Sequence, residues 1–548
     1  MGLLHRVTDK AGSTAFLVRE LARAGIVGPI DPRVVPRILL ALRGLGPTPA
    51  LGYAMNALRR PDALALIDEA GPLTYREVHE RSNALAARLH DLGVGEDDAV
   101  AIMCRNHRGF IESVVAASKL GAHQLLLNTM FGGPQITDVL AREQPVAVVY
   151  DAEFRELVAA GAERLVRVEW DDPADGAGRE RPADVASAEA LIAEGSRDDR
   201  PHPTVRGRMV VLTSGTTGTP KGAARQQPRS LDPVAQILSR MPLRSEERTM
   251  LAAPMFHSWG YLHFSMGFAL GSTLVLRRRF DPEATLAAVA EHRATVLPVV
   301  PVMLQRIMEL PDEALDRHDL SSLRIVALSG SALPGELAVR TMDRLGDVVY
   351  NLYGSTEVGW ATIATPEDLR AAPGTAGRAP RGTIVRLYDD EGREVVGPGR
   401  VGRIFVGNDM RFDGYTGGGG KDVIDGLLSS GDVGHFDEGG RLHVDGRDDD
   451  MIVSGGENVF PREVEDLIAD MEGVTEVAVV GVDDPGFGQR LEAHVVLDAG
   501  SDLDEDAIRA HVRHELASYK VPRAVWFLDE LPRNATGKVL KRTLVGGS

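Results

Sequence analysis

Cysteine is nearly absent from this sequence. The 548 residues include one cysteine, Cys104, which excludes an internal disulfide. Cys104 ends an apolar stretch, residues 100–104, that is typical of a buried strand, so we expect a core thiol and not a nucleophile. Long apolar runs are also lacking: none reaches the roughly 18 residues that a membrane-spanning helix needs. The best candidate, residues 296–304, is broken by Pro298 and Pro301.

Targeting patterns and positive charge are scarce as well. The usual pattern of a secretory signal peptide is lacking, and Arg6 stands where a myristoylation site carries serine or threonine. A cytoplasmic protein is therefore the default expectation. The net charge of −18 argues against nucleic acid as a partner, because phosphate backbones select basic surfaces. A hydrophobic content of 43% provides for a large core, and the length allows more than one domain.

The first 50 residues differ from the rest in charge, with seven Lys or Arg against three Asp or Glu. Phe16, Leu17, Leu21 and Ile26 fall on one face of a predicted helix. A basic amphipathic helix can lie on an anionic membrane, which predicts peripheral contact at the inner face of the membrane. The alternative is a helix packed on its own protein. Residues 1–60 are predicted to form this basic amphipathic arm.

The chain after the arm alternates helical and strand-like stretches. Thr74 and Glu77 form a predicted capping box at a helix start, and strand-like runs follow at 99–104 and 146–150. Such alternation predicts an α/β fold with a parallel, doubly wound sheet. Beyond Asp450 the pattern becomes a small α+β unit. Its predicted helices are 462–470 and 504–517, and its predicted strands are 474–482, 493–497 and 524–528.

A glycine- and threonine-rich loop follows the strand-like run 209–212. Its glycines let the backbone approach a ligand closely, and its hydroxyl and N–H groups can donate to anionic oxygens. The loop is not a Walker A motif, because Pro220 precedes the lysine and Gly222 follows it. We interpret it as a phosphate cradle. Its predicted binding residues are Thr213, Ser214, Gly215, Thr216, Thr217, Gly218 and Lys221.

A second motif, Asn-Leu-Tyr-Gly-Ser-Thr-Glu, occupies residues 351–357. Tyr353 can stack on a flat purine, and Thr356 can donate to an α-phosphate. Glu357 offers the hard oxygen ligand that Mg²⁺ prefers. With Asn351 and Gly354, these residues are predicted to bind a nucleotide.

These two motifs, in this order, resemble the AMP-forming adenylating enzymes, which include acyl-CoA synthetases, peptide-synthetase adenylation domains and firefly luciferase. The resemblance spans roughly residues 61–542 and is nearest to actinobacterial fatty-acid CoA ligases of the FadD type. It implies an α/β body at 61–446 with layered, mostly parallel sheets. It also implies a hinge at 447–450 and a small, mobile α+β lid domain at 451–548.

The resemblance extends to further site residues. The implied acyl-pocket residues are Phe256, His257 and Trp259, and the aliphatic Val300 is predicted to join them. The implied turn between adenine and the acyl chain is Gly330, Ser331 and Ala332. Asp432 resembles the aspartate that accepts from ribose hydroxyls, and Arg447 resembles the arginine that meets ribose and phosphates. Asp449 takes the hinge position of the family. The implied metal ligands are Glu357 and Thr216.

The remaining implied residues lie in the C-terminal unit. Ser454, Gly455 and Gly456 resemble the segment that meets the pantetheine arm of coenzyme A in CoA ligases. Lys538 matches the lysine of a P-x-x-x-x-G-K element and is the implied catalytic lysine, since a mobile point charge can reach both carboxylate and phosphate oxygens.

The implied activity is ATP- and Mg²⁺-dependent formation of an acyl-CoA thioester from a carboxylic acid, with AMP and pyrophosphate released. Aliphatic and small residues near 299–303 and 328–333 favour a fatty or other apolar acid. Two alternatives stay open at this point: transfer of the acyl group to a carrier-protein thiol, and an inactive adenylate-binding protein. Association into a homodimer is a further expectation.

Overall fold

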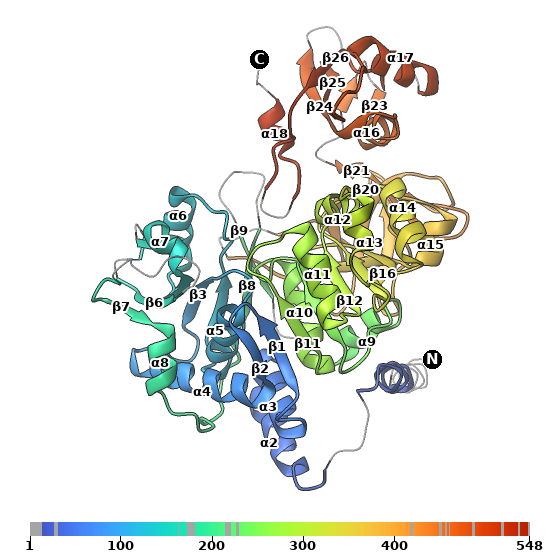
Figure 1. The fold of residues 1–548 in the computed structure, drawn as a ribbon. Coiled ribbons are helices and arrows are strands. Elements are labelled where there is room, and N and C mark those ends of the chain that lie inside the picture. Colours follow the sequence, from blue (N-terminus) through green and yellow to red (C-terminus); the bar gives the residue numbers. More distant parts are fainter. Residues whose placement is uncertain are drawn as a thin grey trace.

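The computed structural model describes most of the chain, and Figure 1 shows its course. The described residues are 14–26, 31–159, 161–162, 164–171, 181–213, 221–225, 230–410, 412–416, 420–448, 452–454, 457–459, 461–484, 488–516, 520–534 and 537–545. A large body carries three sheets, and a smaller C-terminal domain with a fourth sheet lies above it in this view. The expected α/β fold with a small C-terminal α+β domain is confirmed.

One eight-stranded sheet holds the strands that lead to the phosphate loop. Its order is β18 (Phe412–Tyr415), β9 (Lys221–Arg225), β8 (Met209–Thr213), β4 (His123–Leu126), β3 (Ala99–Met103), β5 (Ala147–Asp151), β6 (Val166–Trp170) and β7 (Val185–Ser187). The six strands β8, β4, β3, β5, β6 and β7 run parallel to one another. The other two, β9 and β18, are antiparallel to their neighbours. We name this the phosphate-loop sheet.

A second eight-stranded sheet carries the other nucleotide motif. Its order is β15 (Gly359–Ala364), β14 (Val349–Ser355), β13 (Ile325–Leu328), β12 (Val296–Val299), β10 (Arg248–Leu251), β11 (Thr273–Leu276), β1 (Leu64–Asp68) and β2 (Gly71–Thr74). Only the two edge strands, β2 and β15, are antiparallel to their neighbours. The predicted mostly parallel architecture is therefore present in both large sheets.

Helices separate and cover the two sheets. Alternate residues of β3 show the layering: Val100 and Ile102 join the core between the sheets, while Ala101 and Met103 face the outer core. The inner helices are α4 (Tyr75–Asp91), α5 (Arg108–Lys119) and α10 (Ser258–Leu270). The outer helices are α6 (Gly133–Glu143) and α7 (Arg155–Ala159) on one side, and α11 (Pro282–His292), α12 (Pro301–Met308) and α14 (Gly335–Leu345) on the other.

The body also contains shorter helices and a third, antiparallel sheet. The helices are α8 (Ala188–Glu194), α9 (Asp232–Leu238), α13 (Asp312–Asp316) and α15 (Pro366–Ala371). The third sheet has β16 (Ile384–Tyr388), β17 (Gly402–Gly407), β19 (Val423–Ile424), β20 (Leu427–Phe436) and β21 (Leu442–Arg447). The predicted capping box is present at α4, where Thr74 accepts from the Glu77 N–H and Glu77 accepts from the Thr74 N–H.

The C-terminal domain matches the predicted α+β pattern closely. Its strands are β22 (Ile452–Ser454), β23 (Glu457–Val459), β24 (Val474–Asp484), β25 (Gly488–Leu497) and β26 (Ala524–Phe527), and its helices are α16 (Pro461–Ala469), α17 (Glu505–Glu515) and α18 (Lys541–Leu544). The strand predicted at 493–497 begins five residues earlier, because residues 488–492 extend the long hairpin with β24.

The N-terminal arm is packed on the body. Residues 14–23 form a helix in which Phe16 is 7% exposed and Leu21 is 8% exposed. The Arg381 guanidinium lies 4.7 Å from the centre of the Phe16 ring, and the Ser245 N–H donates to the Ala24 carbonyl. Two further helices follow, α2 (Val35–Leu45) and α3 (Pro49–Arg59). The apolar face around Phe16 therefore covers the protein's own core, as the alternative to membrane contact predicted.

Cys104 is buried, as expected, beside His107 and Asp151. These three side chains are close enough to suggest a metal site, but both nitrogens of His107 are used in local structure. Its Nδ1 accepts from the Gly109 N–H and caps α5, while its Nε2 lies 2.7 Å from the Asp151 carboxylate. Burial raises the pKa of Cys104 well above its usual value. The group is a structural helix cap.

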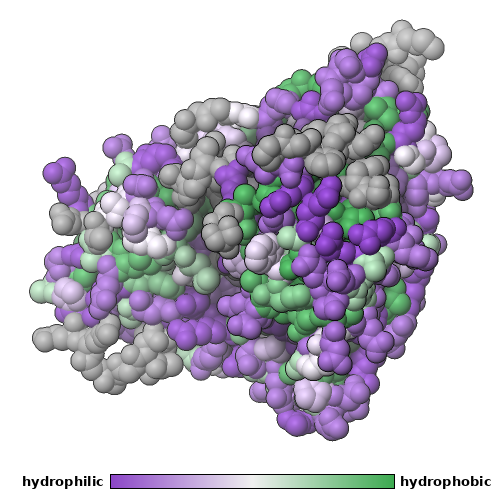
Figure 2. All heavy atoms as spheres, turned by 90° about the horizontal axis from the view of Figure 1, so that it is seen from above, coloured by the Kyte–Doolittle hydropathy of each residue, from purple (hydrophilic) through white to green (hydrophobic). Residues whose placement is uncertain are grey.

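The described surface is mostly polar on the side of the C-terminal domain, with apolar patches between the polar regions (Figure 2). Among the described residues, every helix is too short or too polar to cross a membrane.

Candidate functional site

A cavity of about 1550 Å³ is lined by the second nucleotide motif, by Met209 and Leu212 of β8, by the C-terminal domain and by the N-terminal arm. Single-ligand pockets usually measure roughly 300–1,000 Å³, so this volume has room for more than one ligand. The predicted site residues that line it are His257, Trp259, Gly330, Ser331, Ala332, Asn351, Tyr353, Gly354, Thr356, Glu357, Asp432, Arg447 and Lys538.

The phosphate loop is bracketed by two paired strands. β8 enters the loop and β9 leaves it, and Thr213 pairs with Lys221 across this hairpin. Gly222 packs closely against Thr416: a Cβ atom added to Gly222 would come within 2.6 Å of the Thr416 hydroxyl. The loop residues Ser214, Gly215, Thr216, Thr217 and Gly218 lie outside the described residues, as do the side chains of Thr213 and Lys221.

Tyr353, Asp432 and Arg447 form one polar group at the boundary with the C-terminal domain. Asp432 on β20 pairs with Arg447 on β21, so sheet register places their side chains together. The Tyr353 hydroxyl donates to Asp432 at 2.6 Å, and the Arg447 Nε lies 3.6 Å from the other Asp432 oxygen. Burial raises the pKa of Asp432, although the bond from Tyr353 and the charges of Arg447 and Lys538 oppose that rise.

Lys538 lies on a hairpin that reaches from the C-terminal domain into the cavity. The Asn534 side chain accepts from the Lys538 N–H at 2.9 Å, and Arg533 pairs with Val539 across the turn. Gly537 has a φ of +77°, and a Cβ atom there would come within 2.3 Å of Val302 on α12. The turn therefore requires glycine both for its backbone conformation and for its close approach to the body.

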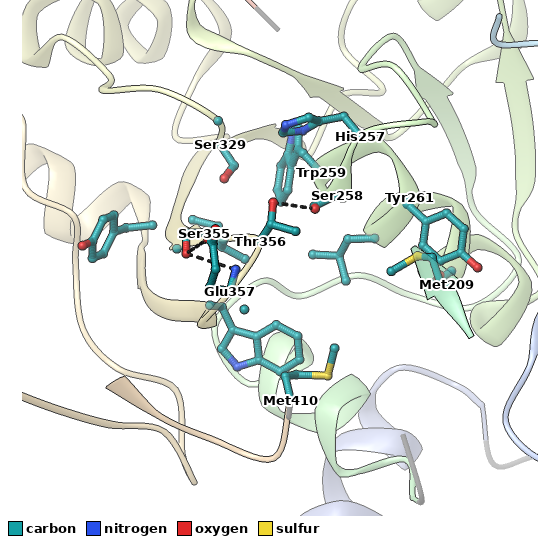
Figure 3. A pocket seen from close by; sticks show the side chains of 18 of the residues that line it. Met209, His257, Ser258, Trp259, Tyr261, Ser329, Ser355, Thr356, Glu357 and Met410 are labelled. Atoms are coloured by element: carbon teal, nitrogen blue, oxygen red, sulfur yellow. Dashed lines mark hydrogen bonds between the residues drawn. The ribbon is translucent and has the colours of Figure 1, made fainter. Parts of the chain in front are cut away.

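Thr356 and Glu357 follow β14 and face the cavity (Figure 3). The Thr356 hydroxyl lies 3.1 Å from that of Ser258, at the start of α10. Tyr415 and Ser355 each donate to the Glu357 carboxylate, at 2.8 and 2.9 Å. Burial acts to raise the pKa of Glu357, but these hydrogen bonds outweigh it and hold the pKa below its usual value. Glu357 is thus kept ionised.

A further part of the cavity begins at α10. His257 precedes this helix, and burial lowers its pKa to about 4, so its imidazole is neutral around pH 7. The Trp259 indole donates to the Val299 carbonyl at 2.9 Å, which fixes the ring as part of the wall. Met209, Tyr261 and Met410 lie around the same space (Figure 3). The wall of this chamber is mostly apolar, although polar side chains such as Asn56, Asn128 and Ser265 also line the cavity.

Some predicted residues do not line the cavity. Phe256 is buried in the core behind the wall. Val300 packs under Gly330 and Gly537. A Cβ atom added to these glycines would lie 3.4 Å and 3.7 Å, respectively, from the Val300 side chain. Asp449, Gly455 and Gly456 lie outside the described residues, and so does the side chain of Ser454.

Sequence reasoning missed several residues that line or support the site. Tyr415, which holds Glu357, lies on a four-residue strand with no motif of its own. Ser258 and Ser355 stand beside predicted residues but carried no separate signal. The wall also includes residues from the N-terminal segment, among them Leu21, Ile26, Leu42, Met55 and Arg59. The periodicity of Leu21 and Ile26 was visible, but it did not identify the partner of that face.

Comparison with known proteins agrees with this site. The family model described as AMP-binding enzyme matches residues 53–416, and the model of its C-terminal domain matches residues 463–538. Feruloyl-CoA synthase of Amycolatopsis is 36% identical over 91% of this chain and 98% of its own. Indoleacetate–CoA ligase of Aromatoleum aromaticum is 33% identical over 86% of this chain and 92% of its own. Long-chain-fatty-acid–CoA ligase FadD13 of Mycobacterium tuberculosis is 30% identical over the same shares.

Solved structures show the same fold. ATP-bound MatB from Rhodopseudomonas palustris superposes with a TM-score of 0.79 at 29% identity, over 90% of this chain and 98% of its own. The amide bond synthetase McbA from Marinactinospora thermotolerans superposes with a TM-score of 0.77 at 29% identity, over 90% and 99%. The family model, the relatives and the shared fold all lead to one assignment: the chain belongs to the AMP-binding enzymes, the adenylate-forming superfamily that includes acyl-CoA ligases.

Proposed function

We propose that this protein is an ATP-dependent, AMP-forming acid–CoA ligase that acts on an apolar carboxylic acid, with a long-chain fatty acid as the first expectation. The supporting observation is the shared cavity. One end carries the second nucleotide motif, residues 351–357, and Lys538, and the rest is a mostly apolar chamber that continues to the N-terminal helices.

The proposed reaction has two steps. A carboxylate oxygen of the acid attacks the α-phosphorus of ATP, and pyrophosphate leaves with the electrons of the broken P–O bond. The thiol sulfur of coenzyme A then attacks the acyl carbon, and AMP leaves. The protein contributes alignment and charge neutralisation, because no covalent intermediate with a side chain is needed.

The cavity residues supply that alignment. Lys538 neutralises charge between the carboxylate and the α-phosphate, and Thr356 donates to the phosphate. Asp432 and Arg447 hold the ribose, and Tyr353 and Asn351 lie against the base beside Gly330–Ala332. The phosphate loop, with Lys221, holds the outgoing pyrophosphate. His257 and Trp259 border the carboxylate end of the acid.

Glu357 fits a divalent cation. Its carboxylate is held ionised by Tyr415 and Ser355 inside the nucleotide end of the cavity, and hard oxygen ligands suit Mg²⁺. Glu357, together with Thr216, would hold Mg²⁺, which supplies charge neutralisation on the phosphate oxygens.

The second step needs access for coenzyme A. We propose that the C-terminal domain, residues 451–548, turns about 447–450 with Asp449 as the hinge residue, which withdraws Lys538 and brings Ser454, Gly455 and Gly456 to the cavity. Domain motions of this kind complete one catalytic arrangement at a time. In this structure the lysine hairpin lies in the cavity, as the first step requires. A cytoplasmic enzyme remains our expectation.

The relatives are named as a feruloyl-CoA synthase, an indoleacetate–CoA ligase and a long-chain-fatty-acid–CoA ligase. Their named substrates therefore include both ring-bearing and linear acids. The continuation of the chamber to α2 and α3 favours a long substrate over a compact one.

A screen of pyrophosphate release tests the proposal. The panel contains acetate, octanoate, palmitate, oleate, ferulate and indoleacetate, each with ATP and Mg²⁺, with and without coenzyme A. We expect the long-chain acids to give the highest kcat/KM and their CoA esters to form. Preference for ferulate or indoleacetate would replace the fatty acid with a ring-bearing one. Pyrophosphate release without any CoA ester would overturn coenzyme A as acceptor and lead to tests with carrier proteins and amines.

A further inference from the structure

The cavity reaches the protein surface at α2. Leu42 lines the cavity and is 42% exposed, and its neighbours Gly46 and Pro47 line the same end. Arg206 also belongs to this end and packs directly on Gly46. In Figure 1, α2 forms the lower end of the molecule, on the side away from the C-terminal domain. The apolar chamber therefore has an exposed margin remote from the nucleotide end.

The outer face of α2 is unusually apolar. Leu39 is 60% exposed and Leu40 is 62% exposed, and they share this face with Pro36 and Arg43 at helical spacing. The opposite face, with Ile38, Ala41 and Leu45, is buried. Three of the six exposed leucines in the described part of the chain lie within these four residues, 39–42. A surface helix normally presents polar residues to solvent, and an exposed apolar cluster marks an interaction site.

The charge around this face is positive in a strongly acidic protein. Residues 31–60 contain five arginines and one aspartate, whereas the whole chain has a net charge of −18. Arg33, Arg37 and Arg43 are all exposed. Arg37 lies 3.6 Å from Asp199, a pair that is exposed on both sides and therefore weak. Exposed leucines flanked by arginines are the pattern of a helix that lies in the interface of an anionic membrane.

We propose that the outer face of α2, defined by Pro36, Leu39, Leu40 and Arg43, is a docking surface for an anionic lipid bilayer. Docking there places the cavity margin at Leu42 next to the bilayer, the source of apolar acids. The supply of apolar acids from the bilayer rests on the proposed function; the binding to the bilayer does not. A second copy of the chain fits less well, because a twofold contact through this face would bring arginines against arginines.

Vesicle flotation tests the proposal with the full-length protein and without substrates. We expect the wild type to float with vesicles of phosphatidylglycerol and phosphatidylcholine, and to do so at least tenfold less with phosphatidylcholine alone. The double variant Leu39→Asp/Leu40→Asp should reduce binding to the mixed vesicles at least tenfold. The matched control Val396→Asp/Val401→Asp adds the same two charges at valines that are 68% and 48% exposed, and should bind like the wild type.

A second variant keeps the test valid if the first misfolds. Arg37→Glu/Arg43→Glu reverses charge on exposed positions and should abolish the preference for phosphatidylglycerol. Wild-type protein that fails to float, or leucine and arginine variants that float normally, would overturn the proposal. A dimer in light scattering that the leucine variant dissociates, with no vesicle binding, would assign this face to a second copy instead. Normal flotation with no activation of any acid would leave this proposal standing and overturn the proposed function.

Discussion

Lys538 and Asp432 line the same cavity although they belong to different domains. The charge of Lys538 acts on the buried Asp432 carboxylate, which places the lysine next to the nucleotide end. In the proposed reaction, a mobile ammonium at this position neutralises charge that develops on the α-phosphate only in the first step.

Lys538→Ala is therefore expected to reduce acid-dependent pyrophosphate release about 10²–10³-fold, the scale of one preorganised donor. Thioester formation from supplied acyl-adenylate should be affected much less. Lys520→Ala is the matched control, because Lys520 belongs to the same domain and pairs with Glu463, and neither residue lines the cavity. Equal losses in both half-reactions would contradict the assigned role.

Tyr415 is expected to act through Glu357. Tyr415→Phe removes the hydroxyl that holds this carboxylate ionised, so the pKa of Glu357 should rise. The Mg²⁺ concentration for half-maximal pyrophosphate release should increase about tenfold, the lower end of what one hydrogen bond to a charged group contributes. Tyr388→Phe loses a similar bond to Asp425, at 3.0 Å, away from the cavity. If both variants need the same Mg²⁺ as the wild type, Tyr415 does not position a metal ligand.

His263 couples stability to pH. Burial lowers its pKa to about 3, and its Nε2 has no hydrogen-bond partner among the described residues. The unfolded chain, with an ordinary pKa near 6.5, takes up the proton first as pH falls. The folded state therefore loses stability below about pH 6.5, by up to about 1.4 kcal/mol per pH unit for this group.

His263→Phe keeps a ring against Trp259 and removes the titrating group. Its melting temperature should fall less than that of the wild type between pH 7 and pH 5. His514→Phe alters a side chain that is 83% exposed and serves as the control. If the melting temperatures of the variant and the wild type fall equally between pH 7 and pH 5, another group is responsible for the pH dependence of stability.

At the scale of single residues, the sequence identified those that belong to contiguous motifs. Tyr353 lies in β14, Thr356 and Glu357 follow that strand directly, and the three could be recognised together in one motif. Tyr415 could not be found in this way, because its partner lies 58 residues away and the contact depends on how β18 pairs with β9. Val300 was expected in the pocket because it is apolar, but apolar character does not tell which side of the wall a residue faces.

At the scale of elements, the lysine hairpin depends on its glycine. Gly537 combines a left-handed φ of +77° with contact against Val302, so Gly537→Ala forces the hairpin away from α12. We expect adenylation to slow at least tenfold while the thioester step changes less. Gly500→Ala tests backbone strain alone, because Gly500 has a φ of +88° with open space around it.

A second-site variant separates contact from strain. Val302→Ala removes the atom nearest to the clash and should restore part of the activity that Gly537→Ala loses, as coupled neighbours do in a double-mutant cycle. Additive effects of the two substitutions would mean that the hairpin does not dock on α12.

Element order was predictable, while element partners were not. Alternating strands and helices predicted the mostly parallel body, and the two helices and three strands predicted for the C-terminal unit were confirmed. The short elements β22, β23 and α18 were not predicted. The helix at 14–23 was equally visible, but an apolar stripe says only that something covers it. Its cover comes from residues such as Arg381 and Ser245, which are more than 200 positions away.

At the scale of the whole molecule, the N-terminal segment completes the acyl chamber. Leu21 and Ile26 line the cavity, so deletion of residues 1–26 should open one wall and leave the nucleotide end intact. We expect a higher KM for the acid, an unchanged KM for ATP and a lower melting temperature. Phe16→Ala weakens the same contact without shortening the chain. It should likewise raise the KM for the acid and lower the melting temperature, and leave the KM for ATP unchanged. No change in the acid KM for either variant would show that the arm is not part of the chamber.

The exposed margin at Leu42 also bears on how the enzyme measures its substrate. A chamber with a closed end limits the length of the substrate, because an acyl tail that is too long clashes with the end of the chamber. A chamber that reaches the surface sets no such upper limit, since surplus methylenes can continue past Leu42 into the surroundings. Discrimination then falls on the carboxylate end and on the first part of the tail, and turnover should level off with increasing chain length where a closed chamber would impose a sharp cut-off.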